Sequence, residues 1–298
     1  MMKMMQLCLE MEAAAADMKD DAEMESYTPA ELQRLVHLTF QCTSKFLAFY
    51  VVNKQCDPIS TDLKSLLCRL PPPYQRIFVD LKNDFGMNIL HQACVCGHLP
   101  LVKMLVQDMG ADVFTATADW EEYVSIHLAA SNGHVEIVKF LSQYHPGLLN
   151  FQDPYGDDAL TLAAKDGNLD VVCYIVDNFP HQIDLERRAR RGRTVLLWAC
   201  ESDNAQLVKY LVEKGADFKS EDCSDEKGRN AAHIAASCDC LSTLCFLLTL
   251  DFNYFISSKT TDGNTLLHSA IEACSERYNL TPQFSHISHF NFIDVPGF

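Results

Sequence analysis

Residues 228–236 read Gly228-Arg-Asn-Ala-Ala-His233-Ile-Ala-Ala236, and the phrase Asn230–His233 inside this stretch returns along the chain. Clear copies are Asn88-Ile-Leu-His91 and Thr265-Leu-Leu-His268. Degenerate copies are Val124–His127, Asp158–Thr161 and Thr194–Leu197. The last residues of the six copies lie 36, 34, 36, 36 and 35 residues apart. Self-similarity at such a period is typical of a solenoid, in which one short unit stacks on the next.

The residues around each phrase extend the pattern outward. In the first unit the phrase is followed by Gly97-His98, then by a Leu/Val-rich stretch, then by Gly110-Ala-Asp112. Each unit therefore holds two short helical patterns separated by a turn. A glycine that supplies backbone angles unfavourable to other residues precedes five of the six phrases. These glycines are Gly86, Gly156, Gly192, Gly228 and Gly263.

Together, the phrase, the Gly-His link and the Gly-Ala-Asp loop resemble the ankyrin repeat, over roughly residues 83–275. The resemblance implies an all-α fold with short β-hairpins, a solenoid of about six repeats. It also implies a concave face, built by hairpin tips and first helices, that binds other proteins. Some positions depart from the pattern. The histidine slot holds Thr161 and Leu197, the turn glycine is replaced by Asp203 and Asp239, and the opening glycine of the second unit by Glu122.

The rest of the chain divides into three segments. Residues 1–27 predict a flexible acidic tail, with seven carboxylates against two lysines in residues 1–26. Residues 28–82 predict a helical N-terminal cap, because the end repeats of a solenoid otherwise expose a hydrophobic face. Residues 276–298 are aromatic and aperiodic. They form either an irregular C-terminal cap or the cut end of a longer protein.

Composition excludes several classes of partner. The net charge of −16 disfavours nucleic acid and anionic membranes. No apolar run approaches the roughly 20 residues that a membrane-spanning helix needs, so we expect no membrane insertion. The 13 cysteines are odd in number and fall mostly in small apolar helical slots, which favours free thiols in a reducing compartment. We expect a cytoplasmic location, with the nucleus as the alternative.

Catalysis and metal binding find little support in the motifs. Asp84-Phe-Gly86 spells a kinase magnesium motif without the other kinase segments, and no G-x-S-x-G elbow or phosphate-binding glycine loop is present. His91, Cys94, Cys96 and His98 lie within eight positions. Because the two histidine slots recur in the repeats, we expect them to bind backbone groups and cap turns rather than bind zinc. The sequence therefore predicts no enzyme, no metal and no cofactor.

A basic run, Arg187-Arg-Ala-Arg-Arg-Gly-Arg193, stands out in this acidic chain. In register, the fourth hairpin tip holds Arg190, Arg191 and Arg193, and the fifth holds Lys227 and Arg229 at equivalent sites. Because arginine binds carboxylates and phosphates bidentately, these residues predict contact with an acidic or phosphorylated partner segment. The alternatives are a solvated turn balanced by neighbouring carboxylates, or a nuclear-import signal.

Two further features predict partner contact. Trp120 and Tyr155 fall on the second and third hairpin tips, and both residue types are enriched in interfaces. Pro71-Pro72-Pro-Tyr74 resembles the P-P-x-Y ligand of WW domains, although a proline run also simply ends a helix.

We therefore expect a non-catalytic adaptor or scaffold that binds a protein partner. The alternative is the recognition arm of a larger enzyme, channel or ubiquitin-ligase receptor.

Overall fold

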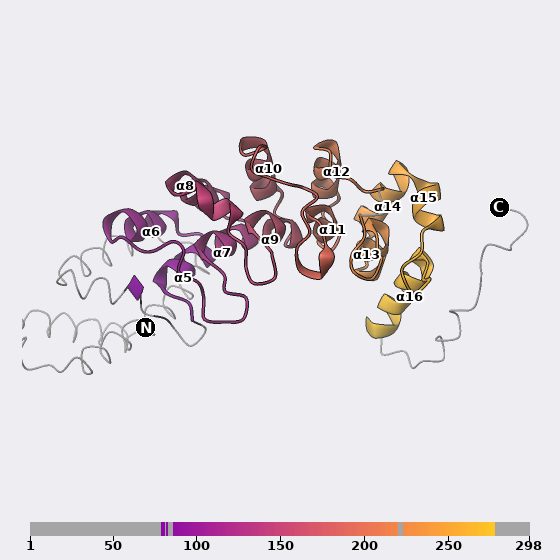
Figure 1. Cartoon of the computed structure of the whole chain (residues 1–298), viewed down its shortest axis with the longest axis horizontal. Helices are drawn as coiled ribbons and strands as arrows, with labels where there is room; N and C mark the ends of the chain where they lie inside the picture. Colours follow the sequence, from indigo (N-terminus) through magenta and orange to yellow (C-terminus); the bar gives the residue numbers. More distant parts are fainter. Residues whose placement is uncertain (1–78, 81, 83–85, 220–222, 278–298) are drawn as a thin grey trace, which may run out of the picture. The chain divides into compact units, whose positions relative to one another are not determined.

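The computed structural model describes residues 79–80, 82, 86–219 and 223–277 of the chain (Figure 1). The acidic tail at 1–27, most of the N-terminal cap at 28–82, the motif Pro71–Tyr74 and residues 278–298 lie outside the described residues. The chain divides into two compact units, Met1–Ser125 and Ile126–Phe298. Each is described by itself.

In the first unit, α5 (Ile89–Val95) and α6 (Leu99–Lys103) form the first repeat, and α6 continues as the π-helical segment η2 (Met104–Asp108). The start of α5 is fixed by a capping box. The Asn88 side chain accepts from the backbone N–H of His91, and His91 Nδ1 accepts from the backbone N–H of Asn88. His98 caps α6 in the same way, through Nδ1 and the backbone N–H of Leu101.

The second unit contains the remaining repeats, and its first helix, α7, begins at the boundary residue Ser125. Its elements are α7 (Ser125–Ser131), α8 (Val135–Tyr144), η3 (Pro146–Asn150), α9 (Ala159–Lys165), α10 (Leu169–Asn178), η4 (Arg190–Gly192), α11 (Val195–Ala199), α12 (Ala205–Glu213), α13 (Ala231–Ser237), α14 (Leu241–Leu250), α15 (Phe252–Ser257) and α16 (Leu266–Arg277).

The helices of the second unit lie in two rows (Figure 1). The first helices α9, α11 and α13 pack on one another, and α16 packs on α13. The second helices α8, α10, α12 and α14 form the other row. Buried alanines recur two residues after the phrase, at Ala163, Ala199 and Ala235, and such small side chains let neighbouring helices approach closely. The all-α repeat fold is confirmed.

Where the sequence replaces an expected glycine, the substituted residue adopts the backbone conformation that glycine favours. Glu122, Asp203 and Asp239 have φ angles of 48°, 51° and 61°, in the left-handed region. This conformation is unfavourable for residues other than glycine, although aspartate adopts it more readily than most. The repeat geometry therefore persists where the residue that favours it has been lost.

The expected β-hairpins reduce to tight turns. Among the described residues there is no β-strand, and the one isolated bridge pairs Lys259 with Thr265. In the second unit each turn spans five residues, and the first and fifth are joined by a hydrogen bond from N–H to carbonyl of 2.9–3.0 Å. We call these turns the tips of repeats three to six; they are residues 153–157, 189–193, 225–229 and 260–264.

Candidate partner-binding surface at the repeat tips

Backbone and side-chain hydrogen bonds join the four tips of the second unit into one edge. The N–H of Arg190 lies 3.4 Å from Asp157 Oδ1 of the preceding tip. The N–H of Glu226 donates to the carbonyl of Arg191 at 3.1 Å, and the N–H of Thr261 donates to the carbonyl of Lys227 at 3.1 Å. We call this row of four tips the tip edge. Because each tip is bonded to the next, side chains at equivalent positions have fixed neighbours.

The third residue of every tip is exposed. These residues are Tyr155, Arg191, Lys227 and Asp262. The two cations therefore occupy equivalent positions on adjacent tips, beside an aromatic residue on the tip before them. This arrangement places two cations and an aromatic ring on one edge of an otherwise acidic protein, where Glu226 and Asp262 are also exposed.

Arg190 and Tyr155 join the third and fourth tips through a cation–π contact. The guanidinium carbon of Arg190 lies 4.1 Å from the centroid of the Tyr155 ring. Such stacking holds a guanidinium against the ring face. The aromatic ring and the arginine thus form one continuous surface.

The fourth tip differs from its neighbours in its first residue. At the third and fifth tips this residue is Asp153 or Asp225, and its carboxylate accepts two backbone N–H groups of its own tip. The fourth tip has Ala189 there, and its third residue, Arg191, takes a left-handed φ of 63°. That conformation costs an L-residue about 1–2 kcal/mol. Strain of this kind is concentrated at functional sites, which makes Arg191 a candidate contact residue.

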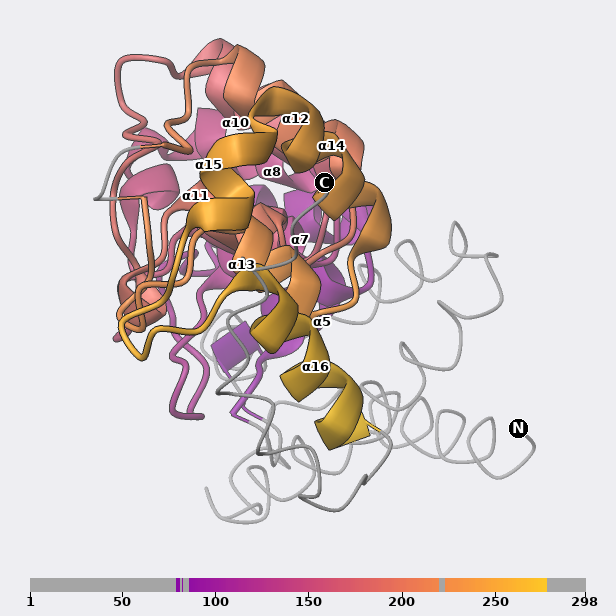
Figure 2. The same cartoon turned by 90° about the vertical axis from the view of Figure 1, so that its right-hand side faces the viewer.

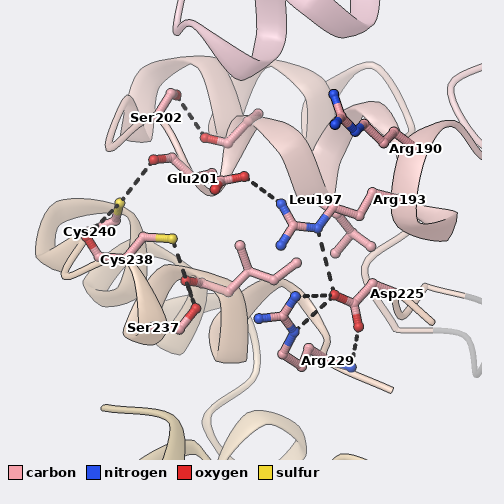
Figure 3. A network of polar contacts seen from close by, with 12 residues as sticks. Arg190, Arg193, Leu197, Glu201, Ser202, Asp225, Arg229, Ser237, Cys238 and Cys240 are labelled. Carbon is pink, nitrogen blue, oxygen red and sulfur yellow. Dashed lines mark hydrogen bonds and ion pairs between the residues drawn. The ribbon is translucent and has the colours of Figure 1, made fainter. Parts of the chain in front are cut away.

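Arg193 was expected on the exposed tip, and this expectation is wrong. Only 2% of Arg193 is exposed, and its Nη1 pairs with Glu201 (Figure 3). Its Nε lies 3.6 Å from Asp225 Oδ2, and its guanidinium lies 4.5 Å from the Trp198 ring centroid. The reason is its position: Arg193 is the fifth residue of the tip, where the chain turns back toward the first helix of the repeat. The charge of Arg193 is therefore buried and paired inside the repeat stack.

Arg229 occupies the same fifth position one repeat later and is half-buried. Its Nε and Nη2 donate to Asp225 Oδ2 at 2.9 Å and 2.7 Å (Figure 3). Burial alone would raise the pKa of Asp225, but the hydrogen bonds from Arg229 hold it below its usual value. Asp225 therefore stays charged between the arginines of two successive repeats. Arg229 bonds to the repeat stack, so it is a weaker candidate for partner contact than Lys227.

Arg187 joins two repeats in a similar way, a role that the sequence did not predict. Its Nη1 donates to the carbonyl of Gly156 at 2.9 Å, and its Nη2 lies 2.5 Å from Asp158 Oδ2. The five arginines of residues 187–193 thus divide by function. Arg187 and Arg193 hold neighbouring repeats together, whereas Arg188 and Arg191 are exposed and Arg190 stacks on Tyr155.

Trp120 lies in the first unit, where 77% of its surface is exposed, the largest fraction among the large apolar side chains described. It follows Asp119, whose carboxylate accepts the hydroxyl of Thr117 at 2.6 Å and the N–H of Glu122 at 3.1 Å. The turn that carries Trp120 is therefore ordered by local hydrogen bonds, and the ring remains a candidate contact of its own unit.

The two histidines of the first repeat bind backbone groups, and Cys94 lies in the core. His91 Nε2 donates to the carbonyl of Thr115 at 2.9 Å, and burial lowers the pKa of His91 to about 4. Burial also raises the pKa of the Cys94 thiol. Within the described ranges, no three His, Cys, Asp or Glu side chains are arranged to hold a metal ion. No described helix combines the length and apolar character needed to cross a membrane.

Comparison with known proteins agrees with this geometry. A family model described as "Ankyrin repeats (3 copies)" matches residues 126–222 and 160–258, and one described as "Ankyrin repeats (many copies)" matches residues 90–142. The chain is 24% identical to the nuclear factor NF-kappa-B p105 subunit of Gallus gallus, over 71% of the chain and 21% of that protein. It is 25% identical to human NF-kappa-B inhibitor zeta, over 68% of the chain and 27% of that protein.

A channel protein is also similar. The chain is 31% identical to the Caenorhabditis elegans homolog of transient receptor potential cation channel subfamily A member 1, over 54% of the chain and 13% of the channel. The chain thus spans about a fifth or less of the length of two of these relatives, p105 and the channel, and about a quarter of the third. The relatives are as different as a nuclear factor subunit and a cation channel, so what they share with the chain is the repeat. Because the family models together match residues 90–258, more than half of the chain, the chain belongs to the ankyrin repeat family.

Proposed function

We propose that this protein is a non-catalytic adaptor or scaffold whose tip edge binds an acidic or phosphorylated segment of a protein partner. Ankyrin repeats are protein–protein interaction modules, so the general function follows from the family. The observation that supports the finer proposal is the row of Tyr155, Arg191 and Lys227 in equivalent exposed positions, with Arg190 stacked on Tyr155.

The chemistry of these side chains favours an anionic ligand. An arginine binds a carboxylate or a phosphate through two parallel N–H bonds, and a lysine adds a compact positive charge. Tyr155 adds apolar area at the end of the row, and tyrosine and arginine are both common in the centres of interfaces. The net charge of −16 repels an extended polyanion such as nucleic acid more strongly than a short anionic peptide, so the peptide fits this small basic area better.

A binding experiment with charge-reversed variants tests the proposal. Fluorescent nonapeptides rich in glutamate or phosphoserine, with a glutamine-rich control, are titrated with the full chain by fluorescence anisotropy. The double variant Arg191→Glu/Lys227→Glu is compared with Lys139→Glu/Lys209→Glu. The control pair lies on the second helices α8 and α12 and changes the net charge by the same amount.

We expect the tip variant to lose about tenfold or more in affinity, since like charges replace the contact pairs, and the control about twofold at most. Thermal melts should stay close to wild type in both, because all four side chains are exposed or half-buried, and the surface ion pairs of Lys139 with Glu136 and of Lys209 with Glu213 contribute about 1 kcal/mol or less each. An equal loss of affinity in both variants would mean that the peptide responds to the net charge of the protein and not to the tip edge. Wild-type protein that binds no anionic peptide would disprove the anionic ligand.

A second proposal concerns the protein to which the chain belongs. We propose that the repeats are the recognition arm of a larger protein, on the observation that the chain spans only 21% of p105 and 13% of the channel homolog. An immunoblot of native tissue with an antibody against residues 126–277 tests this. A band well above the recombinant chain supports it, and a band at the same position contradicts it.

For either form we propose a cytoplasmic location, with the nucleus as the alternative. The proposal is supported by the thiols of the described residues, none of which forms a disulfide.

A further inference from the structure

The last helices of the second unit expose an apolar face. Leu241 is 67% exposed on α14, Phe252 and Ile256 are 57% and 47% exposed on α15, and Leu267 is 48% exposed on α16. These three helices lie nearest the viewer at the end of the repeat rows in Figure 2. Exposed apolar patches on a folded unit are typical of surfaces to which another segment or molecule binds.

On α14 and α15, which contact each other, the exposed apolar residues recur at helical spacing. Leu241 and Cys245 are four residues apart on α14, and Phe252 and Ile256 are four apart on α15, so each pair lies on one side of its helix. Neither helix contains a charged residue. The preceding second helix, α12, has Lys209 where α14 has Cys245. That helix is amphipathic, whereas α14 is apolar on nearly all sides.

Within the described residues, the sixth repeat does not cover α14 as the earlier repeats cover their neighbours. In the other repeats the turn after the first helix lies six residues beyond the phrase, as at Gly167 or Asp239; the corresponding residue, Cys274, lies inside α16. The helix α16 has 12 residues, against 7, 5 and 7 in α9, α11 and α13. The described chain, which ends at Arg277, thus contains no second helix of the sixth repeat.

Residues at equivalent positions of the second helices are buried to different extents. Val172 of α10 and Val208 of α12 are both buried, whereas Leu244, at the same position of α14, is only half-buried. The next repeat covers this position in α10 and α12. At α14 that cover is missing from the described part of the chain.

The segment that directly follows α16 has the composition to supply the cover. Of its 21 residues, 278–298, nine are large apolar or aromatic and only Asp294 is charged. The apolar set is Tyr278, Leu280, Phe284, Ile287, Phe290, Phe292, Ile293, Val295 and Phe298. Fully extended, 21 residues span roughly 70 Å, and a helix of the length of α14 is about 15 Å long, so the segment can reach the whole face.

We propose that residues 278–298 pack on the apolar face of α14 and α15 as a C-terminal cap of the repeat stack. The cap takes the place of the second helix that the described part of the sixth repeat lacks, and it buries Leu241, Phe252 and Ile256. The proposal rests on the composition of the face and of the segment, and is independent of the proposed function of the tip edge.

Cys245 provides a natural probe, because its side chain lies on this face. The full chain is pulse-labelled with N-ethylmaleimide, and labelling of each cysteine is measured by peptide mass spectrometry. Wild type is compared with Phe290→Asp/Phe292→Asp and with Ser285→Asp/Ser288→Asp, which adds the same charge at polar positions of the segment.

We expect Cys245 to be labelled at least about tenfold faster in the phenylalanine variant than in wild type or the serine variant, because a carboxylate cannot pack on an apolar face. Cys173, half-buried on α10, should be labelled at one rate in all three. Equal rates for Cys245 in all three proteins would overturn the proposal. Protection that increases with protein concentration would also overturn it, since a second copy would then supply the cover.

A reciprocal experiment does not depend on variants of the segment itself. Phe252→Asp disrupts the face, and its control, Asn253→Asp, adds the same charge at the next exposed residue of α15. Chymotrypsin should cleave after Phe290 and Phe292 several times faster in Phe252→Asp than in wild type or the control, since proteases cut segments that are not packed. If wild type is cleaved as fast as Phe252→Asp, the segment does not pack on this face.

Discussion

At the scale of single residues, two arginines two positions apart have opposite environments. Arg191 is exposed, whereas Arg193 is buried between Glu201 and Asp225, against Trp198. Removal of one partner of a buried ion pair costs about 3–5 kcal/mol, whereas exposed charges contribute about 1 kcal/mol or less. The same chemical change at the two positions should therefore have very different effects.

We expect Arg193→Met to lower the free energy of unfolding by about 3 kcal/mol, near the lower limit because Asp225 keeps its bonds to Arg229. Arg191→Met should change it by less than about 0.5 kcal/mol. Urea denaturation followed by circular dichroism measures both. A similar, small loss in the two variants would mean that the buried network contributes little to stability.

At the scale of elements, the close approach of one tip to the next limits what a tip glycine tolerates. Gly228 and Gly263 both have left-handed φ angles, 68° and 81°. A Cβ added at Gly228 would lie 2.8 Å from the backbone nitrogen of Thr261 on the next tip, whereas one at Gly263 would meet nothing within 4 Å. The backbone strain is thus shared, and the steric clash is confined to Gly228.

Gly263→Ala should therefore lower the free energy of unfolding by about 1 kcal/mol, the cost of the left-handed conformation. Gly228→Ala should cost at least about 1 kcal/mol more, because the bonded tips must separate. Thermal melts of the two variants beside wild type measure the difference. Equal shifts in melting temperature would show that the tips move apart freely.

The same elements show how far the sequence predicts this structure. The repeat period and the first-helix phrases predict the helices correctly, because both are set by local capping and by apolar spacing. The burial of Arg193 depends on how the fifth residue of a tip meets Asp225 of the next repeat, and one-dimensional spacing carries no such information. The sequence predicts the start of α16 but not its length. The helix continues past Cys274 because no turn forms at the position where the earlier repeats have one.

At the scale of the whole molecule, buried histidines in both units couple stability to pH. Burial lowers the pKa of His91 to about 4 and also lowers the pKa of His127 and of His233. In the unfolded chain these groups bind protons near pH 6.5. Their stabilising contribution is therefore complete above pH 6.5 and is lost as the pH falls toward 4. Burial raises the pKa of Asp157 to about 6, so this group increases the free energy of unfolding as the pH falls. It is one group, whereas three histidines act in the opposite direction.

The free energy of unfolding should accordingly be nearly constant from pH 8 to 7 and should decrease from pH 6.5 to 5. The shift at His91 alone corresponds to about 3 kcal/mol over its whole interval. His127→Thr tests the cause, because Thr161 fills the same slot in the third repeat without a titrating ring. At pH 7.5 the variant should melt below wild type, since the bond from His127 Nε2 to the carbonyl of Phe151 is lost. At pH 5 the gap should narrow, because wild type alone must keep that ring neutral; a constant gap would mean that this histidine does not carry the pH dependence.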